Sequence, residues 1–282
     1  MIKENFVRLF ESSIKNNWEL PALTDYIEKN TLTYGEVGEE VAKLHLLFDN
    51  IGIQQGDKIS LIGKNGVNWC ITYIATVTYG AVIVPILQDF APSNVQHIVN
   101  HSDSVLLFTS DNIWETLEEE KIPDLRAVFS INDFRCLHQH DGETIQKETK
   151  LLPANFKKKF PDGFTAADVL YPTISNAELV CISYTSGTTG FSKGVMLPGN
   201  SLAGNISYGI DTHLIERGDR QLAFLPLAHS YGCAFDFLTA FCVGAHTTFL
   251  GKIPSPKVLL KAFAEIQPTC IFTVPLIIEK MY

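Results

Sequence analysis

Two kinds of hydrophobic pattern alternate along this chain. Short apolar runs rich in β-branched residues predict buried strands, and segments with apolar residues at every third or fourth position predict helices. The predicted strands cover 21–26, 58–63, 81–87, 104–109, 127–131, 179–184, 221–229, 245–250 and 269–274. The predicted helices cover 6–14, 35–50, 67–79, 94–100, 114–120, 200–210, 235–243, 257–265 and a segment that begins at 275. Such alternation is typical of parallel βαβ units, and it predicts an α/β fold.

One segment has the length of a membrane span. No charged residue stands between Lys64 and Asp89, and about twenty apolar residues are enough to cross a bilayer. Gly80 and Pro85 interrupt the segment, however, and its second half is β-branched. We therefore predict a buried helix that turns at Gly80 into a strand, and no transmembrane segment.

Residues 132–178 break the alternation because they are polar, charged and rich in turn-forming residues. We expect a polar excursion or surface loop there. His138 and His140 have no catalytic partner nearby in the sequence, so we assign them no role.

Composition and charge narrow the classes of partner. The chain has 282 residues, of which 46% are hydrophobic, enough to bury the core of two lobes. Its formal net charge of −9 argues against nucleic acid as a partner. The six cysteines form no C-x-x-C pair and no Cys/His cluster with zinc spacing. With no secretory signal pattern at the N-terminus, these features favour a cytoplasmic protein.

The strongest chemical pattern is the segment 184–195, YTSGTTGFSKGV, which follows the predicted strand 179–184. Glycines allow a backbone to approach a ligand closely, and hydroxyls, amides and a lysine offer donors and positive charge to phosphate oxygens. The spacing does not fit G-x-x-x-x-G-K, because Ser192 stands where that motif has its lysine. We therefore predict a phosphate loop of another kind that binds ATP. Its candidate residues are Thr185, Ser186, Gly187, Thr188, Thr189, Gly190 and Lys193.

This segment closely resembles the phosphate-loop signature of the adenylate-forming, AMP-binding superfamily, which usually has proline at the position of Ser192. Three further stretches extend the resemblance to the acyl-CoA synthetases. The stretch from TLTYGEV to YGAVIVPI resembles their N-terminal lobe, LPLAHSYG resembles their next signature, and VPLIIEKMY resembles the long-chain enzymes in particular.

The resemblance implies two doubly wound, mostly parallel sheets with flanking helices. Residues 58–219 would form the lobe with the phosphate loop, and residues 1–57 and 220–282 would form a second, incomplete lobe. The chain would then be the incomplete N-terminal domain of the acyl-CoA synthetase-like fold. We expect a fragment that stops about halfway through a family member.

For function, the resemblance implies an AMP-forming acid–thiol ligase that joins a long-chain fatty acid to coenzyme A, with ATP and Mg²⁺. The hydroxyls of the loop and Lys193 would hold the β- and γ-phosphates, and Thr185 would also meet Mg²⁺. His229 would be catalytic, facing the carboxylate and closing the acyl channel. The Mg²⁺-binding glutamate, the ribose-binding aspartate and the C-terminal lysine of the family are absent from this sequence. The fragment alone is therefore expected to be inactive.

Several alternatives remain open. The parent could be an acyl-AMP ligase or an activator of aryl or amino acids. From another class, the chain could be a non-catalytic nucleotide-binding protein. The acyl chain length, a homodimer and peripheral contact with the inner face of a membrane are also left open.

Overall fold

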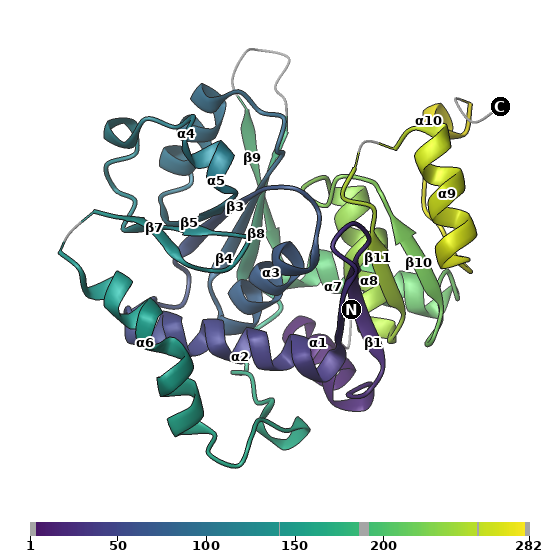
Figure 1. The fold of residues 1–282 in the computed structure, drawn as a ribbon, viewed down its shortest axis with the longest axis horizontal. Helices are drawn as coiled ribbons and strands as arrows, with labels where there is room; N and C mark the ends of the chain where they lie inside the picture. The colour runs from purple at the N-terminus through teal and green to yellow at the C-terminus, as the bar shows by residue number, and fades with distance from the viewer. Residues whose placement is uncertain (1–3, 141, 186–191, 253, 280–282) are drawn as a thin grey trace.

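The computed structural model describes residues 4–140, 142–185, 192–252 and 254–279. Two β-sheets organise these residues (Figure 1). The larger sheet has the strand order β7-β6-β5-β3-β4-β8-β9. Its strands are β3 (Lys58–Ile62), β4 (Val82–Ile86), β5 (Ser104–Thr109), β6 (Ala127–Ser130), β7 (Cys136–Gln139), β8 (Leu179–Thr185) and β9 (Lys193–Pro198). The smaller sheet has the order β10-β11-β1-β2, with β1 (Pro21–Asp25), β2 (Asn30–Thr33), β10 (Arg220–Ala223) and β11 (His246–Phe249).

Both sheets are parallel at their centres and antiparallel at one or both edges. In the larger sheet β3, β4, β5, β6 and β8 run parallel, while the edge strands β7 and β9 are antiparallel to their neighbours. In the smaller sheet only β2 is antiparallel. The predicted α/β class with two mostly parallel sheets is therefore confirmed. One hydrophobic cluster joins residues of both sheets, and the division into the lobes 1–57 plus 220–282 and 58–219 stays a prediction.

Helices flank both sheets. The longer ones are α1 (Phe6–Asn16), α2 (Tyr34–Asn50), α3 (Val67–Tyr79), α4 (Pro92–His101), α6 (Thr144–Lys159), α7 (Gly199–Asp211) and α9 (Pro256–Ile266). The shorter ones are α5 (Asp111–Trp114), η1 (Glu119–Lys121), η2 (Ala166–Asp168), the π-helix η3 (Gly232–Leu238), α8 (Thr239–Val243) and α10 (Pro275–Glu279). Most boundaries agree with the predicted ones within a few residues, as expected where an apolar face fixes the period.

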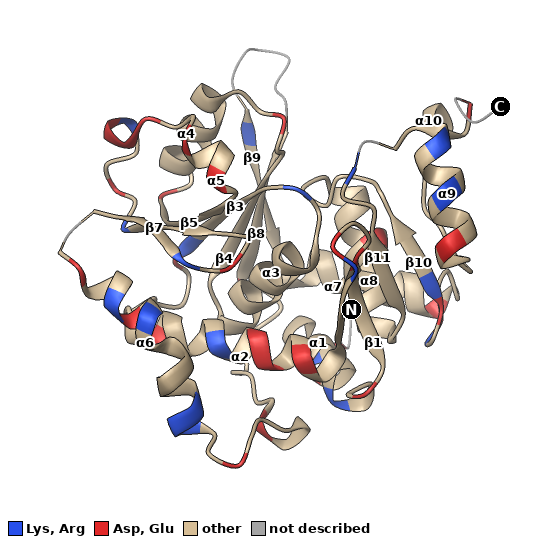
Figure 2. Ribbon diagram, viewed as in Figure 1, with Lys and Arg blue, Asp and Glu red and all other residues tan. Residues whose placement is uncertain are grey.

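Helix α3 is buried on every side, because eleven of its thirteen residues are buried. It packs against α1 and α2 and against strands of both sheets, β1, β3 and β4. Figure 2 shows charged residues along the outer helices α2, α6 and α9, whereas α3 has none. The hydroxyls of Thr72 and Thr76 donate to the carbonyls of Asn68 and Thr72, each at 2.8 Å. The uncharged segment is thus the predicted buried helix, which ends at Gly80. No helix in the described part of the chain is long and apolar enough to cross a membrane.

A carboxylate from the smaller sheet holds the N-terminus of α3. Asp25, the last residue of β1, accepts a hydrogen bond from the Val67 amide at 3.0 Å through its Oδ1. The first amides of a helix have no partner within the helix, and in a buried helix they need one from elsewhere. Burial raises the pKa of Asp25 to about 6, and the nearby charge of Glu28 acts in the same direction.

Four sequence expectations were wrong. The predicted helix 114–120 is replaced by the short α5 and η1, since three adjacent glutamates leave that stretch no apolar face. The predicted strand 221–229 ends at Ala223. The predicted strand 269–274 is only an isolated bridge between Gln221 and Cys270. The excursion 132–178 contains β7 and the sixteen-residue α6.

Helix α6 was not predicted from the sequence because few of its residues are buried. Only Ile145, Leu152 and Phe156 are buried in it, and most of the residues between the first two are charged or polar. The helix packs against α2, which is far away in the sequence. The Lys43 ammonium also lies 5.4 Å from the centre of the Phe156 ring. Tertiary contacts thus decide the structure of this segment.

We expect Asp25→Ala to lower the free energy of unfolding by about 1 kcal/mol, the usual cost of losing a helix cap. Asp25→Asn keeps an oxygen acceptor but has no charge. In the unfolded chain an aspartate has a pKa of about 3.9, so the folded state binds this proton more tightly. Asp25 therefore makes the protein less stable as the pH rises from about 4 to about 6.

Urea unfolding across this pH range measures the effect. Asp25→Asn should flatten the fall in stability, and Asp124→Asn, which removes an exposed charge from a loop, is the matched control. Parallel pH profiles for the wild type and Asp25→Asn would contradict this assignment.

Candidate nucleotide-binding site

The predicted phosphate loop joins two antiparallel strands. Strand β8 ends at Thr185 and β9 begins at Lys193, and these two residues are paired across the hairpin. Both are exposed. The candidate residues Ser186, Gly187, Thr188, Thr189 and Gly190 lie outside the described residues. Strand β8 was predicted, but β9 was not, because its alternation is short and begins inside the glycine-rich motif.

Contacts beneath the loop fix the base of the hairpin. The Tyr184 hydroxyl lies 2.7 Å from Nδ1 of His101, the last residue of α4. A Cβ atom at Gly194 would lie 3.0 Å from Ile182 Cγ2 and 3.2 Å from Tyr184 Cζ, so glycine suits this position. Across the described ranges, no acidic side chain forms an ion pair with Lys193. Its ammonium is therefore available to a bound anion.

The hairpin lies at the edge of the sheet where α/β proteins bind ligands. Strands β3, β4 and β8 are parallel, so their carboxyl ends share one edge. The segment that follows β3, with Asn65, starts from the same edge as the loop after Thr185. Open α/β sheets bind ligands outside the carboxyl ends of their strands.

His229 follows a segment that Asn65 and Asp236 hold. The Asn65 side chain donates to the Leu225 carbonyl at 2.6 Å and accepts from the Leu227 amide at 3.0 Å. The Asp236 carboxylate accepts from the Leu225 amide at 3.2 Å. Asn65 therefore connects the carboxyl edge of the larger sheet to the segment that leads from β10 to His229.

His229 itself is exposed at the turn before η3. Its amide donates to the Pro226 carbonyl at 3.1 Å, and its carbonyl accepts from the Cys233 amide at 2.9 Å. A Cβ atom at Gly232 would lie 2.5 Å from the Pro226 carbonyl oxygen, so only glycine allows this close turn. The backbone at His229 is thus held while the imidazole has no hydrogen bond among the described residues.

Comparison with known protein families shows to which family the chain belongs. The family model described as "AMP-binding enzyme" matches residues 10–282, nearly the whole chain. The chain belongs to the AMP-binding enzyme family. This family is adenylate-forming and uses ATP, in agreement with the resemblance found in the sequence.

Individual relatives agree with this assignment. The chain is 29% identical over 256 residues to the long-chain-fatty-acid–CoA ligase FadD15 of Mycobacterium bovis, covering 89% of this chain and 40% of that ligase. Its fold matches the N-terminal domain of FACL13 from Mycobacterium tuberculosis with a TM-score of 0.77 at 19% identity, covering 99% of this chain and 65% of that one. It also matches ATP-bound MatB from Rhodopseudomonas palustris with a TM-score of 0.75 at 19% identity, covering 99% and 51%. The chain therefore spans less than two thirds of each protein.

The predicted Mg²⁺ ligand of this member of the AMP-binding enzyme family has suitable chemistry. Thr185 presents an exposed hydroxyl at the carboxyl end of β8. Mg²⁺ prefers oxygen ligands and is often bound by one or two protein groups together with water and phosphate oxygens. A single threonine at this position fits such a cation when a nucleotide provides the other ligands.

Sequence reasoning missed two residues of this family member that position the segment before His229. Asp236 is fully buried, and burial raises its pKa to about 7. Its Oδ1 accepts a hydrogen bond from the Gln221 side chain at 2.8 Å. A lone carboxylate within the aromatic run Phe235–Phe237 could have indicated such a role. Asn65 gave no comparable signal, because its partners are backbone groups far away in the sequence.

We expect Asn65→Ala to lower the free energy of unfolding by about 1–3 kcal/mol, because it leaves the Leu225 carbonyl and the Leu227 amide without partners. Hydrogen exchange should show the Leu227 amide exchanging faster. Asn100→Ala is the matched control, since the Asn100 side chain also donates to a backbone carbonyl, that of Lys121, but in an exposed position. Equal effects of the two variants would contradict a specific role for Asn65.

Proposed function

We propose that this chain provides the nucleotide phosphate site of an ATP-dependent long-chain fatty acid–CoA ligase. The observation that carries the proposal is the β8–β9 hairpin, which pairs Thr185 with Lys193 at the carboxyl edge of a parallel sheet. Similarity to the ligase FadD15 supports the long-chain substrate and coenzyme A as the acceptor. The fold shared with ATP-bound MatB supports the same location for the nucleotide. We place this activity in the cytoplasm.

The reaction joins two anions, a carboxylate and the triphosphate of ATP. Its rate therefore depends on holding the reactants in line and on balancing the negative charge of the departing pyrophosphate. Lys193 has no ion-pair partner in the described part of the chain, and its ammonium would balance charge on the β- and γ-phosphates. Thr185 ends β8, across the hairpin from Lys193. Its hydroxyl would donate a hydrogen bond to a phosphate oxygen. When bound, Mg²⁺ supplies further positive charge to the phosphates, held on the protein side by Thr185.

His229 would act at the carboxylate side of the same reaction. The hydrogen bonds from Asn65 and Asp236 fix the backbone that precedes it. A histidine whose imidazole has no other partner can donate to or accept from a substrate. We therefore propose that His229 orients the fatty acid carboxylate.

Lys193→Ala should weaken ATP binding by about 10- to 150-fold, because a hydrogen bond to a charged group contributes about 1.5–3 kcal/mol. Isothermal titration calorimetry with ATP measures the change. Lys147→Ala is the matched control, since it removes one exposed positive charge from α6. Unchanged ATP affinity in Lys193→Ala would contradict the proposed phosphate site.

For turnover, we expect these 282 residues alone to catalyse no measurable exchange of pyrophosphate into ATP with a long-chain fatty acid. The reason is that the family's Mg²⁺-binding glutamate and ribose-binding aspartate are absent from them. Radiolabelled pyrophosphate exchange tests this, with a full-length acyl-CoA ligase as the positive control. Exchange at the rate of that control would contradict the expectation.

A further inference from the structure

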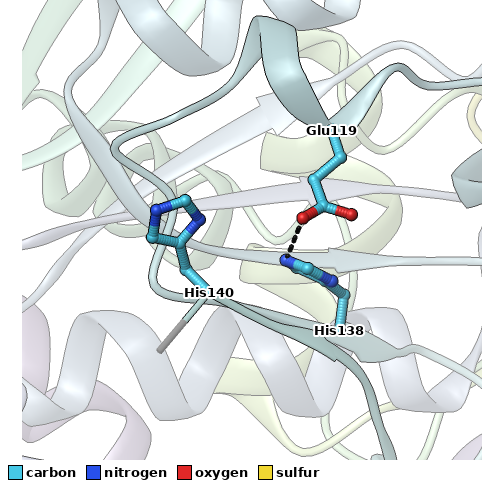
Figure 3. A group of neighbouring side chains, drawn as sticks. All are labelled: Glu119, His138 and His140. Carbon is cyan, nitrogen blue, oxygen red and sulfur yellow. Dashed lines mark ion pairs between the residues drawn. The ribbon is translucent and has the colours of Figure 1, made fainter. Parts of the chain in front are cut away.

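A cluster of two histidines and one glutamate lies on the larger sheet at the edge opposite the nucleotide hairpin. Strand β7 forms that edge, and β9 forms the other. The cluster contains Glu119, His138 and His140, and its three ligand atoms lie within 4.8 Å of one another (Figure 3). Among the described residues, no other group of three histidine, cysteine, aspartate or glutamate side chains is arranged so that it could hold a metal ion.

The edge strand brings the two histidines together. His138 belongs to β7, which pairs antiparallel with β6. The His140 amide continues this ladder by donating to the Arg126 carbonyl at 3.1 Å. Residues two apart on extended backbone point to the same face. Figure 3 shows both imidazoles on the side where Glu119 lies.

Contacts with α4 position Glu119. It begins η1, in the connection between β5 and β6. The Gln96 side chain donates to the Glu118 carbonyl at 3.3 Å, and the Asn100 side chain donates to the Lys121 carbonyl at 2.7 Å. Helix α4 thus holds η1 on both sides of the glutamate.

The His138 ring is held against another ring, and its Nε2 atom has no hydrogen bond among the described residues. It packs on the Trp114 ring with centroids 5.5 Å apart. This Nε2 is shielded from solvent, and the nearest acceptor that the described residues offer in an ion pair is Glu119 Oε1 at 3.3 Å. In a tetrahedral Zn²⁺ site with bonds of about 2.0 Å, neighbouring ligand atoms are about 3.3 Å apart. This pair therefore already has the spacing of two ligands of one metal ion.

We propose that Glu119, His138 and His140 form a binding site for a divalent transition metal, with Zn²⁺ as the best fit. Imidazole suits Zn²⁺ and its neighbours in the first transition row, whereas Mg²⁺ and Ca²⁺ prefer oxygen ligands. Three protein ligands leave one tetrahedral position for water or another group. The metal links the edge strand to the β5–β6 connection, so binding stabilises this edge of the sheet.

The test uses the whole 282-residue chain, freed of metal by a chelator and studied without nucleotide. Co²⁺ binding is followed by visible absorption, and Zn²⁺ then displaces the Co²⁺. We expect one ion per chain and an increase in Tm with Zn²⁺, because a ligand that binds the folded state stabilises it. Loss of a supporting hydrogen bond to a metal ligand costs about 10- to 100-fold in affinity. Loss of a ligand itself, in His140→Ala or Glu119→Gln, should weaken Zn²⁺ binding by at least the same factor.

Both changed side chains are exposed, so the variants should fold, and their melting without metal checks this. The matched control is His213→Ala, because His213 Nδ1 also lies close to a carboxylate, 3.0 Å from Glu216 Oε1, but the described part of the chain gives this pair no third ligand. This control should bind Zn²⁺ as the wild type does. Cys136→Ser should do the same, since the Cys136 thiol is not a proposed ligand.

Three results would overturn the proposal. One is the absence of binding by the wild type, which would leave Glu119 and His138 as a simple ion pair. The second is equal affinity in the wild type and His140→Ala. The third is loss of binding in Cys136→Ser, which would mean that thiolates hold the metal.

Discussion

The arrangement of this chain depends on one buried helix that both sheets share. Helix α3 contacts strands of the two sheets and has no charged residue to turn towards water. Its first amide finds its acceptor in Asp25, at the end of a strand of the other sheet. Because α3 also connects β3 to β4, its position fixes the centre of the larger sheet relative to the smaller one. An apolar helix in this position can satisfy its polar backbone ends only through such contacts.

Around this helix, polar side chains fix the segments that contain the candidate site residues. Asn65 directly precedes the glycine before α3, and its amide holds the backbone on the way to His229. Asp236 holds the same segment from η3. The contact between Tyr184 and His101 fixes the base of the β8–β9 hairpin. The links made by Asn65 and Tyr184 join elements that are far apart in the sequence, so a shift of one of these elements would move a candidate site residue.

The sequence was sufficient to predict the parts of the fold in which local pattern and burial agree. The run from β3 through α3 to β4 was predicted because its apolar residues and Gly80 determine both period and turn. Strand β8 was predicted because it is a short run of mostly buried residues, whereas the phosphate segment that follows it stays a prediction. Helix α6 and strand β9 were missed, since their partners α2 and β8 provide most of what stabilises them.

The same reason explains why the cluster of Glu119, His138 and His140 was not predicted. His138 and His140 are neighbours in the sequence, but Glu119 reaches them only because β6 and β7 fold back towards η1. Asn65 and Asp236 position the segment before His229 by binding backbone groups. Backbone groups are present at every residue, so these contacts produce no sequence motif. The chemistry of the loop therefore stays a prediction, and sequence reasoning missed the contacts that hold the segment before His229.

Under the proposed function, the β8–β9 hairpin would also affect how strongly a nucleotide binds. A segment that is attached at one end must lose chain entropy when it closes around a ligand, and that loss weakens binding. Here Thr185 and Lys193 are already paired across two hydrogen-bonded strands. The two ends of the segment are therefore brought together during folding, and under the proposed function no part of the free energy of phosphate binding would be needed to bring them together.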